Sequence, residues 1–320
     1  MTQPGRLPWQ QIAKLAVLSV PATLIVVPFD VPQPTGLVGF MTGFLASLYG
    51  RYLWAFGALA VAIVAASLSF AGLSFSPVGA VYGVALLLCV LVALAMRHGG
   101  RAAMVFAAFG WVFLLFSSPS DVTNLGVLLG LFGLSGVWGV VATRQLRIAG
   151  MMAPAPDAHR SPYLTGALAT GAGFLVTIAL ADSLPISRPY WIPFVYLQVV
   201  ATTDLSRTHI ILRRMFGALI GAAGAFALMA IGVPVIVQML VALMAFAFAL
   251  RHLMSLPMLS RALTTMSVIL IVLATDDSAL SARLLAEVSA AAILLVVALI
   301  LGLRKPPAKT EGASTTGERA

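Results

Sequence analysis

The sequence predicts an all-α, polytopic membrane protein, and three observations support this fold class. Of the 320 residues, 61% are hydrophobic and only 9% are charged, whereas soluble domains carry about a quarter charged residues. The mean hydropathy is +1.04, and a soluble chain this apolar could not cover its own surface with polar groups. The apolar residues also fall into about twelve runs separated by short polar segments. Such runs form helices in a bilayer, because a helix satisfies its own backbone hydrogen bonds.

The apolar runs form two sets of six, which predicts a bundle of about 12 spans. The first set is 12–29, 36–49, 53–73, 77–96, 102–116 and 125–141, and the second is 163–181, 190–202, 210–231, 233–250, 262–274 and 284–303. We expect the first run to stay as an anchor, because no small-residue cleavage site follows it. The runs 36–49, 102–116 and 190–202 are shorter than the ~20 residues of a full span, so they are either tight crossings or re-entrant segments.

The widest polar gap, 144–161, divides the chain into two membrane units. We predict a first six-span repeat over 1–150, a second over 151–305, and a disordered cytoplasmic tail over 306–320. A shift of 160 residues aligns Phe56–Leu59 with Phe216–Leu219, and Arg101 with Arg261. This register predicts a duplication. Halves of six spans each would have the same orientation and be related by an axis along the membrane normal.

Charge predicts the orientation of the bundle. With a cytoplasmic N-terminus and twelve crossings, almost all Lys and Arg residues fall on the inside, Arg261 among them, while Arg188 and Arg283 are the outside exceptions. This pattern follows the positive-inside rule. Five acids fall on the outside: Asp30, Asp121, Asp182, Asp276 and Asp277. We therefore predict a multi-pass protein of the bacterial inner membrane with both termini cytoplasmic.

Several other classes are disfavoured. The net charge of +9 is explained by basic residues beside the spans, so nucleic acid is not an expected partner. The single cysteine, Cys89, excludes an intrachain disulfide and a thiolate metal cluster. The four histidines lack metal-ligand spacing, and no nucleophile elbow or phosphate-binding loop occurs. We expect no metal, no cofactor and no enzymatic activity.

The stretch 188–224, RPYWIPFVYLQVVATTDLSRTHIILRRMFGALIGAAG, has the most distinctive chemistry. Its polar turn suggests an anion-attracting cytoplasmic entrance, because arginine binds carboxylates bidentately. The alternative is ordinary positive-inside topology, with the aspartate as a helix N-cap. The candidate substrate-binding residues of this turn are Asp204, Arg207, Arg213 and Arg214.

The same stretch begins with aromatic residues at the predicted outer face. Tyr190 and Trp191 could stack on an aromatic ligand, with Gln198 and Thr203 offering hydrogen bonds deeper in the bundle. The alternative is an interfacial aromatic belt, in which the rings sit at the level of the lipid headgroups.

Two further features have a structural and a functional reading. Gly217, Gly221 and Gly224 lie on nearly one helix face, which predicts close helix packing, and we assign Pro193 to packing as well. The alternative for the glycines is a glycine-lined substrate path. Glu287 is the only acid deep in a predicted span, which makes it a candidate for proton coupling. The alternative is an i,i+4 ion pair with Arg283.

The second half resembles the FUSC family of fusaric-acid-resistance and aromatic-acid-exporter membrane domains. The resemblance rests on PYWIP at 189–193, the polar turn at 202–207, and Arg-Arg-x-x-Gly-x-x-x-Gly at 213–221. It implies a proton-driven inner-membrane exporter of aromatic carboxylic acids or similar amphipathic anions. The family-matched positions are Tyr190, Trp191, Pro193, Asp204, Arg213, Gly217 and Gly221.

We therefore predict an efflux transporter whose partners are a small organic anion and the lipid bilayer. Larger members of the family carry a sizeable cytoplasmic domain, and this chain shows none. A homodimer and a periplasmic adaptor protein are accordingly partner hypotheses. The rival functions are a non-transporting scaffold or assembly subunit of an efflux complex, and a membrane enzyme acting on lipid-linked substrates.

Overall fold

The computed structural model describes residues 8–29, 31–32, 34–50, 52–73, 75–96, 98–116, 124–151, 163–184, 190–202, 208–252, 256–273 and 279–303. Within these ranges the chain forms twelve α-helices. They are α1 (Trp9–Leu24), α2 (Pro34–Leu48), α3 (Tyr52–Leu73), α4 (Pro77–Met96), α5 (Arg101–Phe116), α6 (Leu125–Gln145), α7 (Tyr163–Ser183), α8 (Trp191–Thr202), α9 (Thr208–Ala230), α10 (Val235–Arg251), α11 (Pro257–Leu273) and α12 (Ala279–Leu303). The predicted all-α fold class is confirmed. The tail 306–320 and the linker 152–162 lie outside the described residues.

Each helix coincides with one predicted apolar run, but two helices begin five residues earlier than the runs indicated. α11 begins at Pro257 rather than at residue 262, and α12 begins at Ala279 rather than at residue 284. Proline suits the first position of a helix, where its missing N–H would have no intrahelical partner. The longer α11 includes Arg261 within the helix. The expected run began one residue after Arg261, so the structure corrects the start of this helix, while the side of the membrane on which Arg261 lies stays a prediction.

The surface of the bundle is that of a membrane protein. The described parts of α3, α4, α6 and α9 are each long and apolar enough to cross a membrane, and further apolar helices are shorter. Large apolar side chains point outward, with Leu53 86% and Ile236 75% exposed. Soluble proteins rarely expose wide apolar patches. The chain is a multi-pass membrane protein with several apolar helices.

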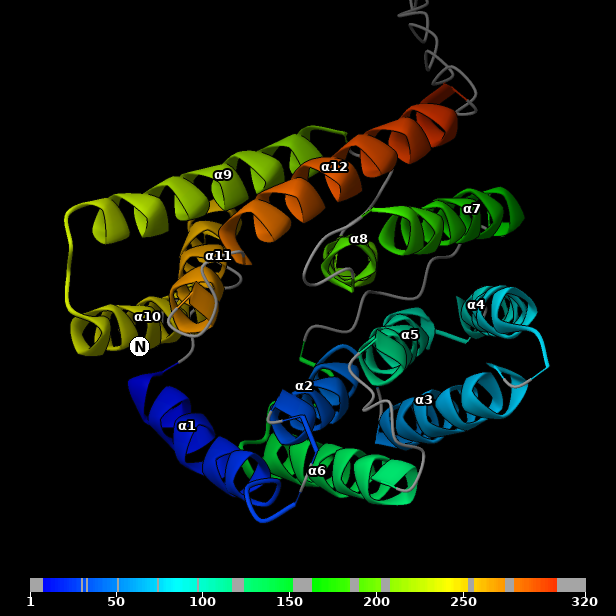
Figure 1. The fold of residues 1–320 in the computed structure, drawn as a ribbon, viewed down its shortest axis with the longest axis horizontal. Coiled ribbons are helices and arrows are strands. Elements are labelled where there is room, and N and C mark those ends of the chain that lie inside the picture. The colour runs from blue at the N-terminus through cyan, green and yellow to red at the C-terminus, as the bar shows by residue number, and fades with distance from the viewer. Residues whose placement is uncertain are drawn as a thin grey trace, which may run out of the picture.

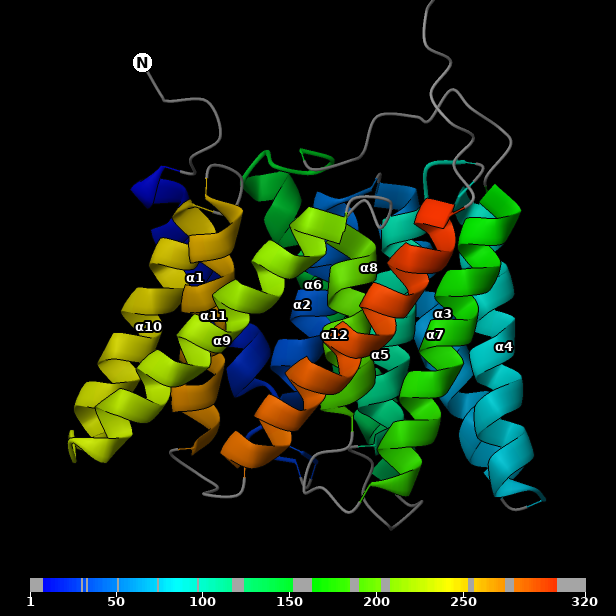
Figure 2. The same cartoon turned by 90° about the horizontal axis from the view of Figure 1, so that it is seen from above.

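The helices form one bundle in which α5 and α8 lie near the middle (Figure 1). The side view shows the first turn of α1 and the last turn of α12 at the same edge of the bundle, and shows α9 and α12 strongly tilted (Figure 2). Neighbouring helices pack as α2 with α6, α3 with α5, α9 with α11 and α10 with α11. The earlier and later helices meet where α5 packs on α8 and where α4 packs on α7.

Close backbone contact explains why some of these pairs fit together. A Cβ atom at Gly43 of α2 would overlap the Gly136 carbonyl oxygen of α6, and one at Gly139 would overlap the Phe40 carbonyl oxygen. Small residues let two helices approach until their backbones touch, which is a main source of association in lipid. A buried hydrogen bond of 2.6 Å between the Ser47 and Thr143 hydroxyls joins the same two helices.

Candidate functional site

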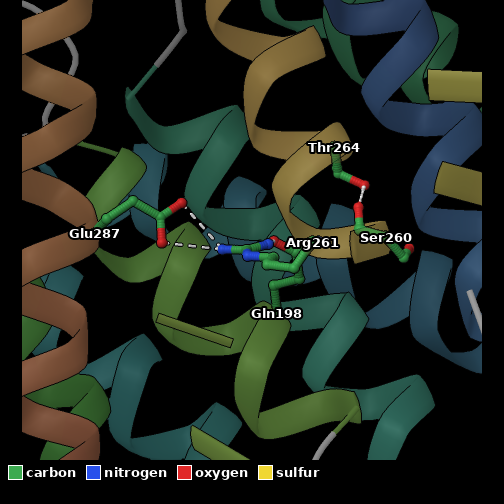
Figure 3. Close-up of polar contacts among 5 residues, drawn as sticks. All are labelled: Gln198, Ser260, Arg261, Thr264 and Glu287. Carbon is green, nitrogen blue, oxygen red and sulfur yellow. Dashed lines mark hydrogen bonds and ion pairs between the residues drawn. The ribbon is translucent and has the colours of Figure 1, made fainter. Parts of the chain in front are cut away.

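A buried ion pair joins two helices of the second half. Nη2 of Arg261 on α11 lies 3.0 Å from Oε1 and 3.1 Å from Oε2 of Glu287 on α12. Each residue is only 7% exposed. Nη1 of Arg261 donates a hydrogen bond to Oε1 of Gln198 on α8. Figure 3 shows Glu287 and Gln198 approaching the guanidinium from different helices. We call these three residues the polar cluster.

The helix that carries Arg261, α11, has several other polar residues around it. Ser260 donates from its hydroxyl to the Ala249 carbonyl oxygen of α10 at 2.9 Å, and Thr264 donates to the Ser260 carbonyl oxygen of its own helix at 2.8 Å. Thr265 follows Arg261 by four residues, so it shares a helix face with Arg261. It is fully buried, and its hydroxyl has no hydrogen-bond partner in the described structure.

The geometry of the ion pair leaves the guanidinium divided between two acceptors. In the strongest arginine–carboxylate pairs, two nitrogens donate in parallel to the two carboxylate oxygens. Here one nitrogen, Nη2, serves both oxygens of Glu287, and the other, Nη1, serves the neutral amide of Gln198. Arg261 therefore holds one carboxylate in a weaker geometry and one amide oxygen where a second carboxylate oxygen would fit chemically.

A small pocket adjoins the cluster. Its polar lining is formed by Arg214, Arg261 and Glu287, and its apolar lining by Val195, Val199, Ile211, Met215, Ala291 and Leu294. The free volume is about 10 Å³, close to the minimum that holds a single water molecule. Sites for small organic ligands enclose roughly 300–1,000 Å³. An organic anion would therefore enter only if the surrounding helices moved apart.

The structure brings together three of the residues singled out in the sequence. Gln198 and Glu287 belong to the polar cluster, and Arg214 lines the pocket beside them. Arg213, by contrast, is exposed on the surface of α9. Thr203, Asp204 and Arg207 lie outside the described residues, as does the side chain of Arg283.

Arg214 also approaches the first half of the chain. It lies close enough to Tyr49, which follows α2, to affect the Tyr49 hydroxyl. The pocket therefore lies near the cytoplasmic end that we predict for α2.

Trp191 of α8 is buried inside the bundle, and Tyr190, the half-buried residue before α8, packs against neighbouring rings. Trp191 is 4% exposed, and the Tyr190 ring packs against Phe194 with centroids 5.3 Å apart. Phe194 in turn stacks on Phe109 of α5, with centroids 3.9 Å apart and planes 17° apart. These ring contacts form the α5–α8 interface, since aromatic pairs add attraction beyond the area that they bury.

Three of the four residues assigned to helix packing are buried, and Gly224 is half-buried. A Cβ atom at Gly217 would lie 2.6 Å from the Met258 carbonyl oxygen, and one at Gly221 would overlap the Ala262 carbonyl oxygen. A Cβ atom at Gly224 would meet only the Met266 sulfur, at 3.2 Å. Pro193 is buried within α8.

Arg261 is the residue that sequence reasoning missed as part of the site. Two signals could have found it: Glu287 needs a partner within the bundle, and the 160-residue shift aligns Arg261 with Arg101, the first residue of α5. Nη2 of Arg101 donates to the Val200 carbonyl oxygen near the end of α8, at 2.9 Å. A cation at this position is favourable, because the last carbonyls of a helix carry partial negative charge.

Comparison with known proteins identifies the second half. Residues 175–297 match the family model described as fusaric acid resistance protein-like, FUSC_2. This segment runs from the middle of α7 into α12 and contains the whole polar cluster. No curated protein and no solved structure matched the chain. Over residues 175–297 the chain is therefore similar to fusaric acid resistance protein-like membrane proteins.

Proposed function

We propose that this protein is an inner-membrane transporter that exports aromatic carboxylic acids or similar amphipathic anions, with transport coupled to protons. The observation that carries the proposal is the buried polar cluster beside Arg214, inside the segment that matches the fusaric acid resistance protein-like family. Charged groups inside a membrane bundle are costly, and where they occur they commonly mark ion and substrate pathways or proton relays.

The arrangement of charges suits an anion. Arg214 and Arg261 both line the pocket, and arginine offers rigidly spaced donors that match a carboxylate. The apolar lining residues would contact the hydrophobic part of an amphipathic substrate. Arg213, with Arg207 and Asp204, remains our proposal for the cytoplasmic entrance, and Tyr190, Trp191 and Thr203 for the path beyond the pocket. Glu287 is the proposed site of protonation.

We further propose that all twelve helices cross the bacterial inner membrane as two repeats with cytoplasmic termini. The packing pairs support this arrangement, because α2 packs with α6 as α8 packs with α12, and α3 packs with α5 as α9 packs with α11. In the two proposed repeats, α4 corresponds to α10 and α7 corresponds to α1. The contacts between the halves agree with this correspondence, since α4 packs with α7 and α10 packs with α1. The common edge of the α1 start and the α12 end supports termini on one side (Figure 2).

Accumulation of labelled benzoate and salicylate by bacteria that express the protein tests the proposed function. We expect wild-type cells to accumulate less of at least one acid than cells with an empty vector. Arg214→Ala should abolish the difference, because it removes one of the two guanidinium groups of the pocket. Arg144→Ala is the matched control, since Arg144 is an exposed residue in the last turn of α6. If cells with Arg214→Ala accumulate as little labelled acid as wild-type cells, at equal membrane abundance, the site assignment is contradicted.

A second function, a non-transporting subunit of an efflux complex, is favoured by the small free volume of the pocket. The two functions differ in what the isolated protein does. A transporter reconstituted alone into liposomes should move benzenesulfonate, a permanently charged anion with little passive permeability. A scaffold should not move it, however well it is folded.

A further inference from the structure

The divided geometry of Arg261 suggests how the site takes its substrate. Nη1, the nitrogen that donates to Gln198, is directed at a neutral acceptor, while Nη2 spans both oxygens of Glu287 (Figure 3). The guanidinium attracts an ionised carboxylate more strongly than the neutral amide of Gln198, because only the carboxylate adds the attraction between opposite charges. A carboxylate brought into the pocket would therefore displace the Gln198 amide from Arg261 more easily than it would displace Glu287.

We propose that Arg261 is the residue that binds the substrate carboxylate, and that Glu287 occupies it as an internal substitute while no substrate is bound. This inference rests on the proposed function and specifies the chemistry of that site. An incoming carboxylate first replaces the Gln198 oxygen at Nη1. It takes both nitrogens when Glu287 becomes protonated and releases Nη2. When the substrate leaves, Glu287 loses its proton and restores the ion pair.

The charges that surround Glu287 determine the sign of this coupling. Of the helices packed against α12, α11 contributes Arg261 and α9 contributes Arg214 at the pocket, whereas α8 contributes the neutral Gln198. On α7 the one charged side chain within the described part is Asp182, which is exposed near the end of that helix. Among the described groups, Glu287 is therefore the negative charge that competes with a substrate carboxylate for the two arginines.

Because of this competition, protonation and anion binding favour each other. An ionised Glu287 holds Arg261, and a protonated Glu287 frees it. Linkage is reciprocal, so anion binding raises the proton affinity of Glu287 by the same factor by which protonation raises the anion affinity. The proton and the substrate then occupy the site together, so each exported anion carries a proton outward, and the outward gradient of the substrate drives export. This differs from the proton-driven export that the family resemblance implies, which would need an exchanger in which proton and anion compete.

Thr265 offers a second contact for the bound carboxylate. It lies one helical turn beyond Arg261 on the same face, is fully buried, and has a hydroxyl without a partner in the described structure. Buried hydroxyls are normally hydrogen-bonded. The Thr265 hydroxyl does not line the pocket as it stands, so it would meet a substrate carboxylate only after the helices move apart.

Binding of benzenesulfonate to the purified, full-length protein in detergent tests the inference. Benzenesulfonate stays ionised at all relevant pH values, so any pH dependence of its affinity belongs to the protein. We expect wild-type affinity to fall as the pH is raised from mildly acidic to mildly alkaline. Glu287→Gln should bind tightly across this range, because its side chain mimics the protonated acid. Arg261→Lys should weaken binding about tenfold or more, since it removes the planar pair of donors.

A second variant keeps the test decisive if Glu287→Gln does not fold. Gln198→Glu would place a carboxylate on Nη1 of Arg261 and so mimic the bound substrate. We expect this variant to lose benzenesulfonate binding at alkaline pH without loss of thermal stability. Asp182→Asn is the matched control, because it makes the same acid-to-amide change at an exposed residue at the end of α7. It should leave both the affinity and its pH dependence as in wild type.

The outcomes separate the inference from the proposed function. If wild type binds benzenesulfonate but its affinity rises with pH, the proton and anion compete and the inference is wrong. The inference is overturned as well if Glu287→Gln keeps the pH dependence of wild type, or if Gln198→Glu binds benzenesulfonate fully at alkaline pH. If the folded wild-type protein neither binds benzenesulfonate or benzoate nor moves them across liposomes, the proposed function itself fails.

Discussion

Arg261 and Glu287 are the side chains whose burial is hardest to explain by packing alone. Removing two charges from water is unfavourable, and their mutual attraction compensates only when hydrogen bonds satisfy both groups. Arg261 meets this condition through two helices at once, because α12 supplies Glu287 and α8 supplies Gln198.

Trp191 shows the opposite case, since it is buried among apolar side chains of the same interior. A change at Trp191 would disturb the fold first, so loss of transport in Trp191→Ala would not identify a binding residue.

The ion pair predicts a measurable non-additivity at the residue scale. Arg261→Met should lower the free energy of unfolding by roughly 3–5 kcal/mol, because it leaves Glu287 buried without this partner. The double variant Arg261→Met/Glu287→Leu should recover most of that loss, since no buried charge of the pair remains. Thermal unfolding in detergent measures both effects, and Arg144→Met provides a surface control. Glu287→Leu alone completes the comparison. If the stability loss of the double variant equals the sum of the losses in Arg261→Met and Glu287→Leu, the pair is not coupled.

At the scale of elements, close helix crossings decide how α9 and α11 meet. The glycines of α9 face backbone carbonyl groups of α11 at Gly217 and Gly221, but a movable methionine side chain at Gly224. Backbone cannot move aside as a side chain can, so the three positions differ in their tolerance of a methyl group. The sequence pattern Gly-x-x-x-Gly indicates close packing, but it does not say which glycine touches backbone.

This difference predicts a gradient along one helix. Gly221→Ala should destabilise the protein by about 1–3 kcal/mol, as overpacked interiors do. Gly224→Ala should change stability far less, because the Met266 sulfur can shift and alanine favours helix more than glycine does. Gly83→Ala on α4 is a control with open space around its Cβ position. Thermal unfolding of the three variants gives the comparison, and equal losses at residues 221 and 224 would show that backbone contact does not control this crossing.

At the scale of the whole molecule, the two ends of the helical bundle predict which loops face each side of the membrane. His98 after α4 and Met151 after α6 should lie with the termini, whereas Phe75 after α3 and Ile231 after α9 should lie on the opposite side, because each helix reverses the direction of the chain. Both Phe75 and Ile231 are strongly exposed. The single native cysteine, Cys89, makes this orientation easy to test.

Single cysteines at these four loop positions, in a Cys89→Ser background, are the variants to compare. In intact spheroplasts, a membrane-impermeant maleimide should label Phe75→Cys and Ile231→Cys. His98→Cys and Met151→Cys should react only after the membrane is permeabilised. The Cys89→Ser background alone is the control for unspecific labelling. Labelling of Met151→Cys from outside would show that the first half makes an odd number of crossings and would overturn the predicted topology.

The sequence by itself determined that the chain is a bundle of apolar helices in a membrane, and it placed each helix within a few residues. It could do so because composition and the spacing of polar residues are local properties, and because a bilayer leaves the backbone few alternatives to a helix. The same local signals singled out Glu287, Gln198 and Arg214. They placed Arg261 outside the membrane helix, since an arginine beside an apolar run resembles the usual cytoplasmic flank.

Only the tertiary structure decided which polar residues meet. Glu287 pairs with Arg261, 26 residues away in the sequence, and Gln198 reaches the same guanidinium from a third helix. Spacing along one helix pointed to Arg283 instead, because neighbours at i and i+4 are the pairs that a sequence displays. The partner of a buried charge depends on how helices cross, and here the crossings depend on backbone contacts at single glycines such as Gly221. That is information about three-dimensional packing, which no local pattern in the sequence contains.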